Sequence, residues 1–125
     1  MKYVYNKLVR DKIPEEINKN GDRKANYKIL DNDEYLRELD KKLFEEAHEF
    51  VEEHSTQELA DLMEVIGAIM KVNNISLDDV EEARNIKNGK KGKFENKIYL
   101  IDVEQDYADD REEKELNKEW RKNGN

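Results

Sequence analysis

The sequence predicts a mainly α protein built around an antiparallel helical hairpin, with a small two-stranded β element. Residues 33–53 and 56–72 repeat apolar side chains at the three- and four-residue spacing of one helical face. The polar segment near 53–56 is short enough to hold only a tight turn. Residues 27–30 and 97–103 have the apolar and β-branched composition of strands, so we expect them to pair.

Size and composition limit what the chain can be. With 125 residues and 36% hydrophobic residues, we expect one domain with a modest core that a partner chain would help to complete. The net charge of −8 argues against nucleic acid and anionic membranes as partners. Without cysteine there are no disulfides or thiolate metal sites, and no apolar run suits a membrane span or signal sequence. We therefore expect a cytoplasmic protein.

The N-terminal segment is basic in an otherwise acidic protein. Lys7, Arg10 and Lys12 lie between apolar residues, and Pro14 can begin a short helix near 15–19. The three cations suit binding to phosphate oxygens. Alternatively, the segment is a surface arm paired with the protein's own acids, and from the residues alone we favour this second interpretation.

Capping residues mark the starts of the two long helices. Asp31 or Asp33 can cap the first helix. Ser55 can cap the second, because Ser55 and Glu58 have the spacing of a capping box. These signals agree with the apolar periodicity and place the turn of the hairpin between the two helices.

A third helix is expected over residues 77–87. Ser76 is its candidate N-cap, and the Asn-Gly pair at 88–89 is a good C-terminal stop. In the run that follows, Lys91 and Lys93 lie around a glycine, so the segment can approach and neutralise a phosphate group. The alternative is a flexible charged loop.

Four acids of the long helices are the main candidates for function. Glu46 and Glu49 lie on one flank of the first apolar stripe, and Glu58 and Asp61 lie on the same flank of the second. In an antiparallel hairpin, residues at the same level have residue numbers that add up to a constant total. This total is equal for the pair Glu49 and Glu58 and for the pair Glu46 and Asp61. We therefore expect the four carboxylates to converge. They would repel one another, and a hard cation such as Mg²⁺, Mn²⁺ or Ca²⁺ would relieve that repulsion.

A simpler interpretation of these acids is equally open at this point. Charged residues make up 43% of the chain, so acids at helical spacing are expected by chance. Glu58 can act only in the capping box, and Glu45 and Glu49 can belong to a solvated face. The pattern alone does not decide between a metal site and surface charge.

The motifs together resemble one known family, the phosphoribosyl-ATP pyrophosphohydrolase-like branch of the MazG-type all-α nucleotide pyrophosphohydrolases. The resemblance covers about residues 3–103, with a shorter gap between the acid pairs than in many relatives. Four short motifs occur in the family's order, at 5–17, 45–50, 58–66 and 92–100. The family pattern E-E-x-x-E followed by E-x-x-D is met by Glu45, Glu46, Glu49, Glu58 and Asp61.

The resemblance implies an enzyme that hydrolyses the α–β phosphoanhydride of a nucleoside triphosphate or phosphoribosyl-nucleotide. The products are a monophosphate and pyrophosphate, the cofactor is Mg²⁺ with Mn²⁺ as the alternative, and the assembly is a dimer or tetramer. Residues 1–103 would be the catalytic domain. Residues 104–125 would be an acidic and mixed-charge tail, compatible with a helix around 109–121.

The resemblance also implies roles for individual residues. Glu45 or Glu49 would orient or deprotonate the attacking water. The metal ligands would be Glu46, Glu49, Glu58 and Asp61. The phosphate-binding cations would be Lys7, Arg10, Lys12, Lys42, Lys91 and Lys93, although Lys42 could instead pair with the acids. Two alternatives are a non-catalytic module that binds nucleotide and metal, and a helical protein-interaction module; the motif set favours the enzyme.

Overall fold

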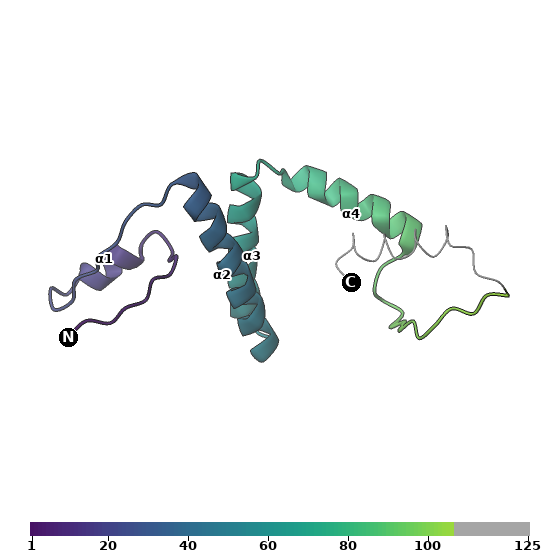
Figure 1. Ribbon diagram of the computed structural model, residues 1–125, viewed down its shortest axis with the longest axis horizontal. Helices are drawn as coiled ribbons and strands as arrows, with labels where there is room; N and C mark the ends of the chain where they lie inside the picture. The colour runs from purple at the N-terminus through teal and green to yellow at the C-terminus, as the bar shows by residue number, and fades with distance from the viewer. Residues whose placement is uncertain (107–125) are drawn as a thin grey trace. The chain divides into compact units, whose positions relative to one another are not determined.

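The computed structural model describes residues 1–106 and is mainly helical, as the sequence predicts (Figure 1). Contacts divide the chain into two units, Met1–Lys91 and Gly92–Asn125. The predicted helix around 109–121 lies outside the described residues. In residues 1–106, none of the helices is long and apolar enough to span a bilayer. The helices are α1 (Ile13–Asn18), α2 (Asn32–Glu52), α3 (Thr56–Val72) and α4 (Leu77–Lys91).

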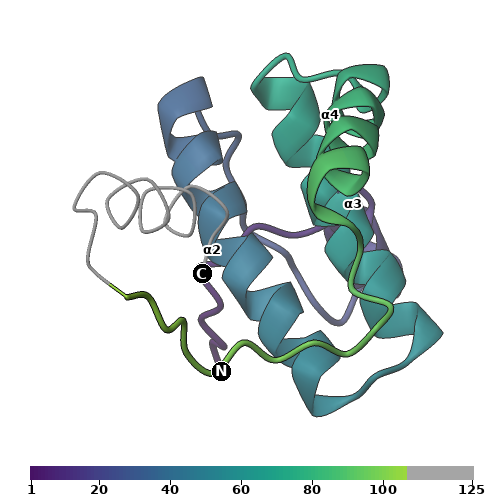
Figure 2. The same cartoon turned by 90° about the vertical axis from the view of Figure 1, so that its right-hand side faces the viewer.

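Helices α2 and α3 pack along one another as the predicted antiparallel hairpin (Figures 1 and 2). Only residues 53–55 separate them, so the chain reverses in a tight turn. The Asp31 carboxylate accepts a hydrogen bond from the Glu34 N–H at 2.8 Å, and the Ser55 hydroxyl accepts one from the Glu58 N–H at 3.2 Å. Each bond provides an acceptor for a backbone N–H of the first helical turn, which has none within the helix. These bonds confirm the predicted caps.

The apolar interior of the hairpin is small. Leu39, 2% exposed, is the only buried residue in the part of the chain that the structure describes. Leu43 and Ala47 of α2 and Leu62 of α3 are half-buried, in agreement with the predicted stripes. One buried residue is far too few for a self-sufficient core, because the folding of a domain depends on removing much of its apolar surface from water.

Helix α3 is apolar on more than one side. Leu59, Met63 and Ile66 remain 43%, 64% and 41% exposed, although their spacing placed them in the stripe that faces α2. A helix that is apolar around most of its circumference is normally buried on all of those sides. The hairpin therefore leaves one apolar face of α3 uncovered.

The segment before the hairpin contains α1, with Pro14 in its first turn as predicted. The Asn18 side-chain oxygen accepts a hydrogen bond from the Ala25 N–H at 2.8 Å, which ties the following loop to the end of α1. Tyr27 and Ile29 then line a pocket together with residues of α1. This stretch thus runs beside a helix in irregular structure.

The predicted β element is wrong for the described residues, because residues 27–30 and 97–103 have no strand structure. Lys97 has a φ of 59°, a left-handed conformation that interrupts the second extended run at its first residue. The side chains of Ile98 and Ile101 are 83% and 85% exposed. β-Propensity depends on packing against cross-strand neighbours, and composition alone did not supply such a neighbour.

Helix α4 extends beyond its predicted end at residue 87. The Ser76 hydroxyl caps it, accepting a hydrogen bond from the Asp79 N–H at 3.1 Å, as predicted. The helix continues through Gly89 to Lys91, and Gly92 follows with a φ of 82°. A glycine inside a helix costs only about 1 kcal/mol relative to alanine, so Gly89 is tolerated and Gly92 provides the turn out of the helix.

Candidate metal centre

Three of the four predicted ligands meet between α2 and α3. Glu46 comes from α2, and Glu58 and Asp61 come from successive turns of α3. Each offers one carboxylate oxygen, and these oxygens lie within 4.8 Å of one another. All three residues are half-buried. A set of three oxygen donors at this separation is compatible with a hard divalent cation, which leaves positions for water and phosphate oxygens. We call these three residues the acidic cluster.

The hairpin explains why these residues meet. Glu58 and Asp61 are three residues apart and share one face of α3. The Glu46 carboxylate on α2 lies within 4.8 Å of that of Asp61 on α3, as expected for residues near one level of a hairpin with a short turn. Glu49, the fourth predicted ligand, is exposed and lies outside the acidic cluster. Burial is the main cause of the raised pKa of Glu46 and of Glu58, and the charge of Glu49 adds to both shifts, so Glu49 is near enough to affect their ionisation.

The electrostatics of the acidic cluster oppose full ionisation. Burial raises the pKa of Glu46; Lys42 opposes this, and Asp61 adds to it. Partial burial likewise raises the pKa of Glu58, followed by the charges of Asp61 and Glu49. Both shifts show that negative charge is costly here, so a cation placed among these carboxylates would be stabilised.

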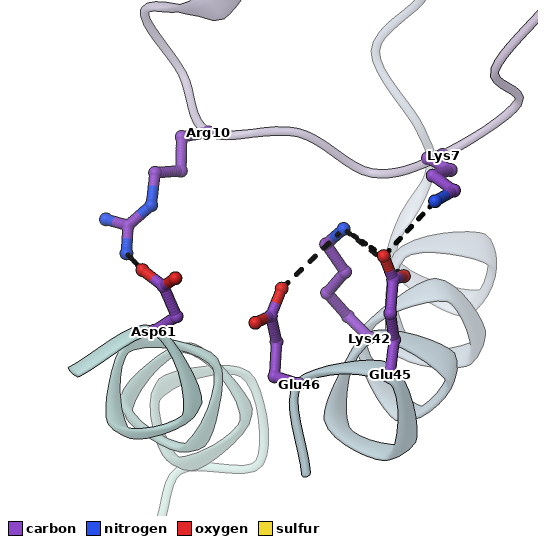
Figure 3. A network of polar contacts seen from close by, with 6 residues as sticks. All are labelled: Lys7, Arg10, Lys42, Glu45, Glu46 and Asp61. Atoms are coloured by element: carbon purple, nitrogen blue, oxygen red, sulfur yellow. Dashed lines mark hydrogen bonds and ion pairs between the residues drawn. The ribbon is translucent and has the colours of Figure 1, made fainter. Parts of the chain in front are cut away.

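One cation is already fixed beside the acidic cluster. The Lys42 ammonium group lies 3.3 Å from the Glu45 carboxylate and 3.9 Å from that of Glu46, and its side chain is only 21% exposed (Figure 3). The i,i+3 and i,i+4 spacing on α2 brings the three residues together. From the sequence, Lys42 could either pair with the acids or contact a phosphate, and the structure shows it paired with two glutamates.

Glu45, a predicted catalytic residue, is engaged by cations. Burial alone would raise the pKa of Glu45, but hydrogen bonds from Lys7 and Lys42 and their positive charges outweigh it and lower that pKa. A carboxylate with a lowered pKa and two ammonium partners is a poor proton acceptor. Glu45 is therefore a weaker candidate for activating water than the exposed Glu49.

The basic N-terminal segment crosses over both helices of the hairpin (Figure 3). The Lys7 ammonium group lies 3.2 Å from Glu45 of α2, and the Arg10 guanidinium donates to Asp61 of α3 at 2.9 Å. Of the two interpretations of this segment, the structure shows the arm paired with the protein's own acids. The sequence did not reveal which acids, because the pairs join residues 38 and 51 positions apart.

Three further lysines, Lys12, Lys91 and Lys93, were predicted to bind phosphate. Lys12 immediately precedes α1 and is exposed, and Lys91 is the last residue of α4. Lys93 belongs to the second unit, where it lies 4.0 Å from Glu95. Contact of these three lysines with phosphate stays a prediction.

Comparison with protein-family models, with curated proteins and with solved structures found no match to this chain. The fold and the candidate site define a mainly helical protein with an acidic cluster on a helical hairpin. The resemblance to nucleotide pyrophosphohydrolases therefore rests on the sequence motifs alone.

Proposed function

We propose that the protein is a Mg²⁺-dependent nucleotide pyrophosphohydrolase. It would hydrolyse the α–β phosphoanhydride of a nucleoside triphosphate or phosphoribosyl-nucleotide, giving a monophosphate and pyrophosphate. The observation that supports this best is the acidic cluster lying beneath an arm that carries Lys7 and Arg10. Such a site joins hard oxygen donors to cations suited to a polyphosphate.

In this proposal Glu46, Glu58 and Asp61 hold the metal ion. Bound there, Mg²⁺ or Mn²⁺ would neutralise phosphate charge and lower the pKa of an attacking water. Glu49 orients that water and accepts its proton, since it is exposed at the edge of the acidic cluster. Arg10 and Lys7, on the arm that crosses the hairpin, approach the phosphate oxygens.

The direct test is a panel of canonical and modified nucleoside triphosphates with Mg²⁺, scored for release of both monophosphate and pyrophosphate. Glu49→Gln should abolish hydrolysis while the helical circular-dichroism signal is unchanged. Glu64→Gln, at an exposed position of α3 outside the acidic cluster, is the matched control and should keep full activity. Full activity of Glu49→Gln would remove Glu49 from the mechanism.

Two alternatives predict different outcomes in the same experiment. A non-catalytic module would be stabilised thermally by nucleotide in Mg²⁺ but would release no pyrophosphate. A helical protein-interaction module would show no stabilisation by Mg²⁺, and its behaviour would survive Asp61→Asn. The exposed apolar face of α3 is the feature that favours an interaction role.

We assign that apolar face to a second copy of the chain, so the working form would be a homodimer or tetramer. Leu59, Met63 and Ile66 lie one turn apart along α3 and are 43%, 64% and 41% exposed. With a single buried residue in the described part of the chain, a copy on its own removes little apolar surface from water. Packing this face against the same face of a partner would provide the missing interior.

A further inference from the structure

The arm that crosses the acidic cluster is attached mainly by charge. Residues 1–10 have no helix or strand structure, and all of residues 1–12 except Leu8 are exposed. The arm's two recorded pairs to the hairpin are themselves open to solvent, with Lys7 53% and Arg10 59% exposed. Exposed ion pairs contribute little free energy and are screened by salt, so this attachment is readily reversible.

The two ion pairs differ in what they leave behind when they break. If Lys7 departs, Glu45 keeps its hydrogen bonds from Lys42 at 3.3 and 3.4 Å. Asp61 has Arg10 as its one recorded ion-pair partner within residues 1–106, at 2.9 Å. Asp61 also belongs to the acidic cluster, so its negative charge is the one for which Arg10 and a divalent cation would compete.

We propose that Arg10 is an exchangeable counter-ion. In the metal-free protein its guanidinium neutralises Asp61, and a divalent cation that takes this carboxylate releases Arg10 to bind the oxygens of a pyrophosphate group. The inference rests on the proposed function, because it requires the acidic cluster to bind a metal. In this scheme the arm first pairs with the protein's own acids and then, once metal is bound, contacts phosphate. Both interpretations of the basic segment would thus apply, one after the other.

The exchange has a thermodynamic signature. Metal and guanidinium compete for Asp61, so removing the guanidinium should tighten metal binding when no anion is present. With metal bound, Arg10 contributes to anion binding, so the same substitution should weaken the binding of the anion. By linkage, metal and anion promote each other's binding through Arg10 beyond their direct contact. A residue that only supported the fold would weaken both.

The first measurement uses Mn²⁺ alone as the probe, with the free ion counted by electron paramagnetic resonance. Arg10→Gln should bind Mn²⁺ about twofold to fivefold more tightly than the unchanged chain. Arg10→Lys, which keeps the charge, should stay near the unchanged value. The matched control is Arg84→Gln, which removes an exposed arginine paired to Glu81 at 2.7 Å on α4, and it should change nothing.

The second measurement titrates the magnesium complex of inorganic pyrophosphate in excess Mg²⁺. Arg10→Gln should lose about tenfold in affinity, as expected for a charge-assisted contact, whereas Arg84→Gln should not. A third measurement needs no variant. Chymotrypsin should cut the full chain after Tyr5, which is 73% exposed, faster in Mn²⁺ than in EDTA, because the released arm is more accessible.

The outcomes distinguish a failure of the Arg10 exchange from a failure of the proposed function. Mn²⁺ binding that is equal or weaker in Arg10→Gln, or chymotrypsin cleavage that Mn²⁺ does not accelerate, overturns the exchange and leaves the proposed function standing. Absence of Mn²⁺ binding in the unchanged chain and in every variant overturns both. Tighter Mn²⁺ binding together with weaker pyrophosphate binding in Arg10→Gln supports the exchange.

Discussion

Replacing Glu46 with glutamine should stabilise the metal-free protein. Glu46 faces two like charges, Glu58 and Asp61, within 4.8 Å, and one opposite charge, Lys42, at 3.9 Å. Arg10 offsets the charge of Asp61, and Lys42 is shared with Glu45. The charges of Glu45 and Glu49 also repel Glu46, so about one repulsion is left uncompensated. Two unit charges at this distance interact by about 1 kcal/mol in water and about 3.5 kcal/mol at an effective dielectric constant of 20. Because the site borders solvent, we take about 1 kcal/mol, or about 4 °C in the melting temperature of a domain this size.

The assay is a thermal melt followed by circular dichroism in EDTA, at several pH values. Burial raises the pKa of Glu46, so the ionised folded form is penalised at neutral pH, and the penalty is lost as the pH falls through that raised pKa. The advantage of Glu46→Gln should therefore be largest at neutral pH and shrink toward the ordinary glutamate value of 4.5. A midpoint at neutral pH that is lower than that of the unchanged chain, or no higher than that of Glu64→Gln, would refute this electrostatic account.

Two further predictions concern the assembly and the turn. Met63→Lys places a charge on the exposed apolar face of α3 and should reduce the mass measured by light scattering to that of one chain, while Glu64→Lys should leave it unchanged; a monomeric unchanged chain would contradict the proposed oligomer. Ser55→Ala removes the N-cap of α3 and should cost about 1 kcal/mol in urea unfolding, because the Glu58 N–H loses its acceptor; an unchanged midpoint would show that water replaces the hydroxyl at no cost.

The parts of the fold that sequence predicts well are those that local physics determines. Helices α2 and α3 begin and end within about one residue of the predicted limits, because periodicity, capping hydrogen bonds and a short turn all act within a few residues. The same locality places Glu46 and Asp61 at one level, since a three-residue turn fixes the register of the two helices.

The parts that sequence did not predict depend on distant neighbours or on fine balances. A strand at 97–103 needs a partner, and β-propensity does not say where one lies. The end of α4 depends on which of two glycines leaves the helix, a difference near 1 kcal/mol. The pairing of Arg10 with Asp61 joins residues 51 positions apart, and helical periodicity has no information at that range.

The acidic cluster is encoded within one continuous stretch, residues 46–61, around a turn of three residues. Closing so short a loop carries little entropic cost, and helical hairpins of this kind are among the quickest structures for a chain to make. We therefore expect the carboxylates to come together at an early stage of folding, before distant segments have docked. Their mutual repulsion would then oppose this early structure. If the acidic cluster binds a divalent cation as proposed, the level of that cation should influence how fast the protein folds as well as how firmly it stays folded.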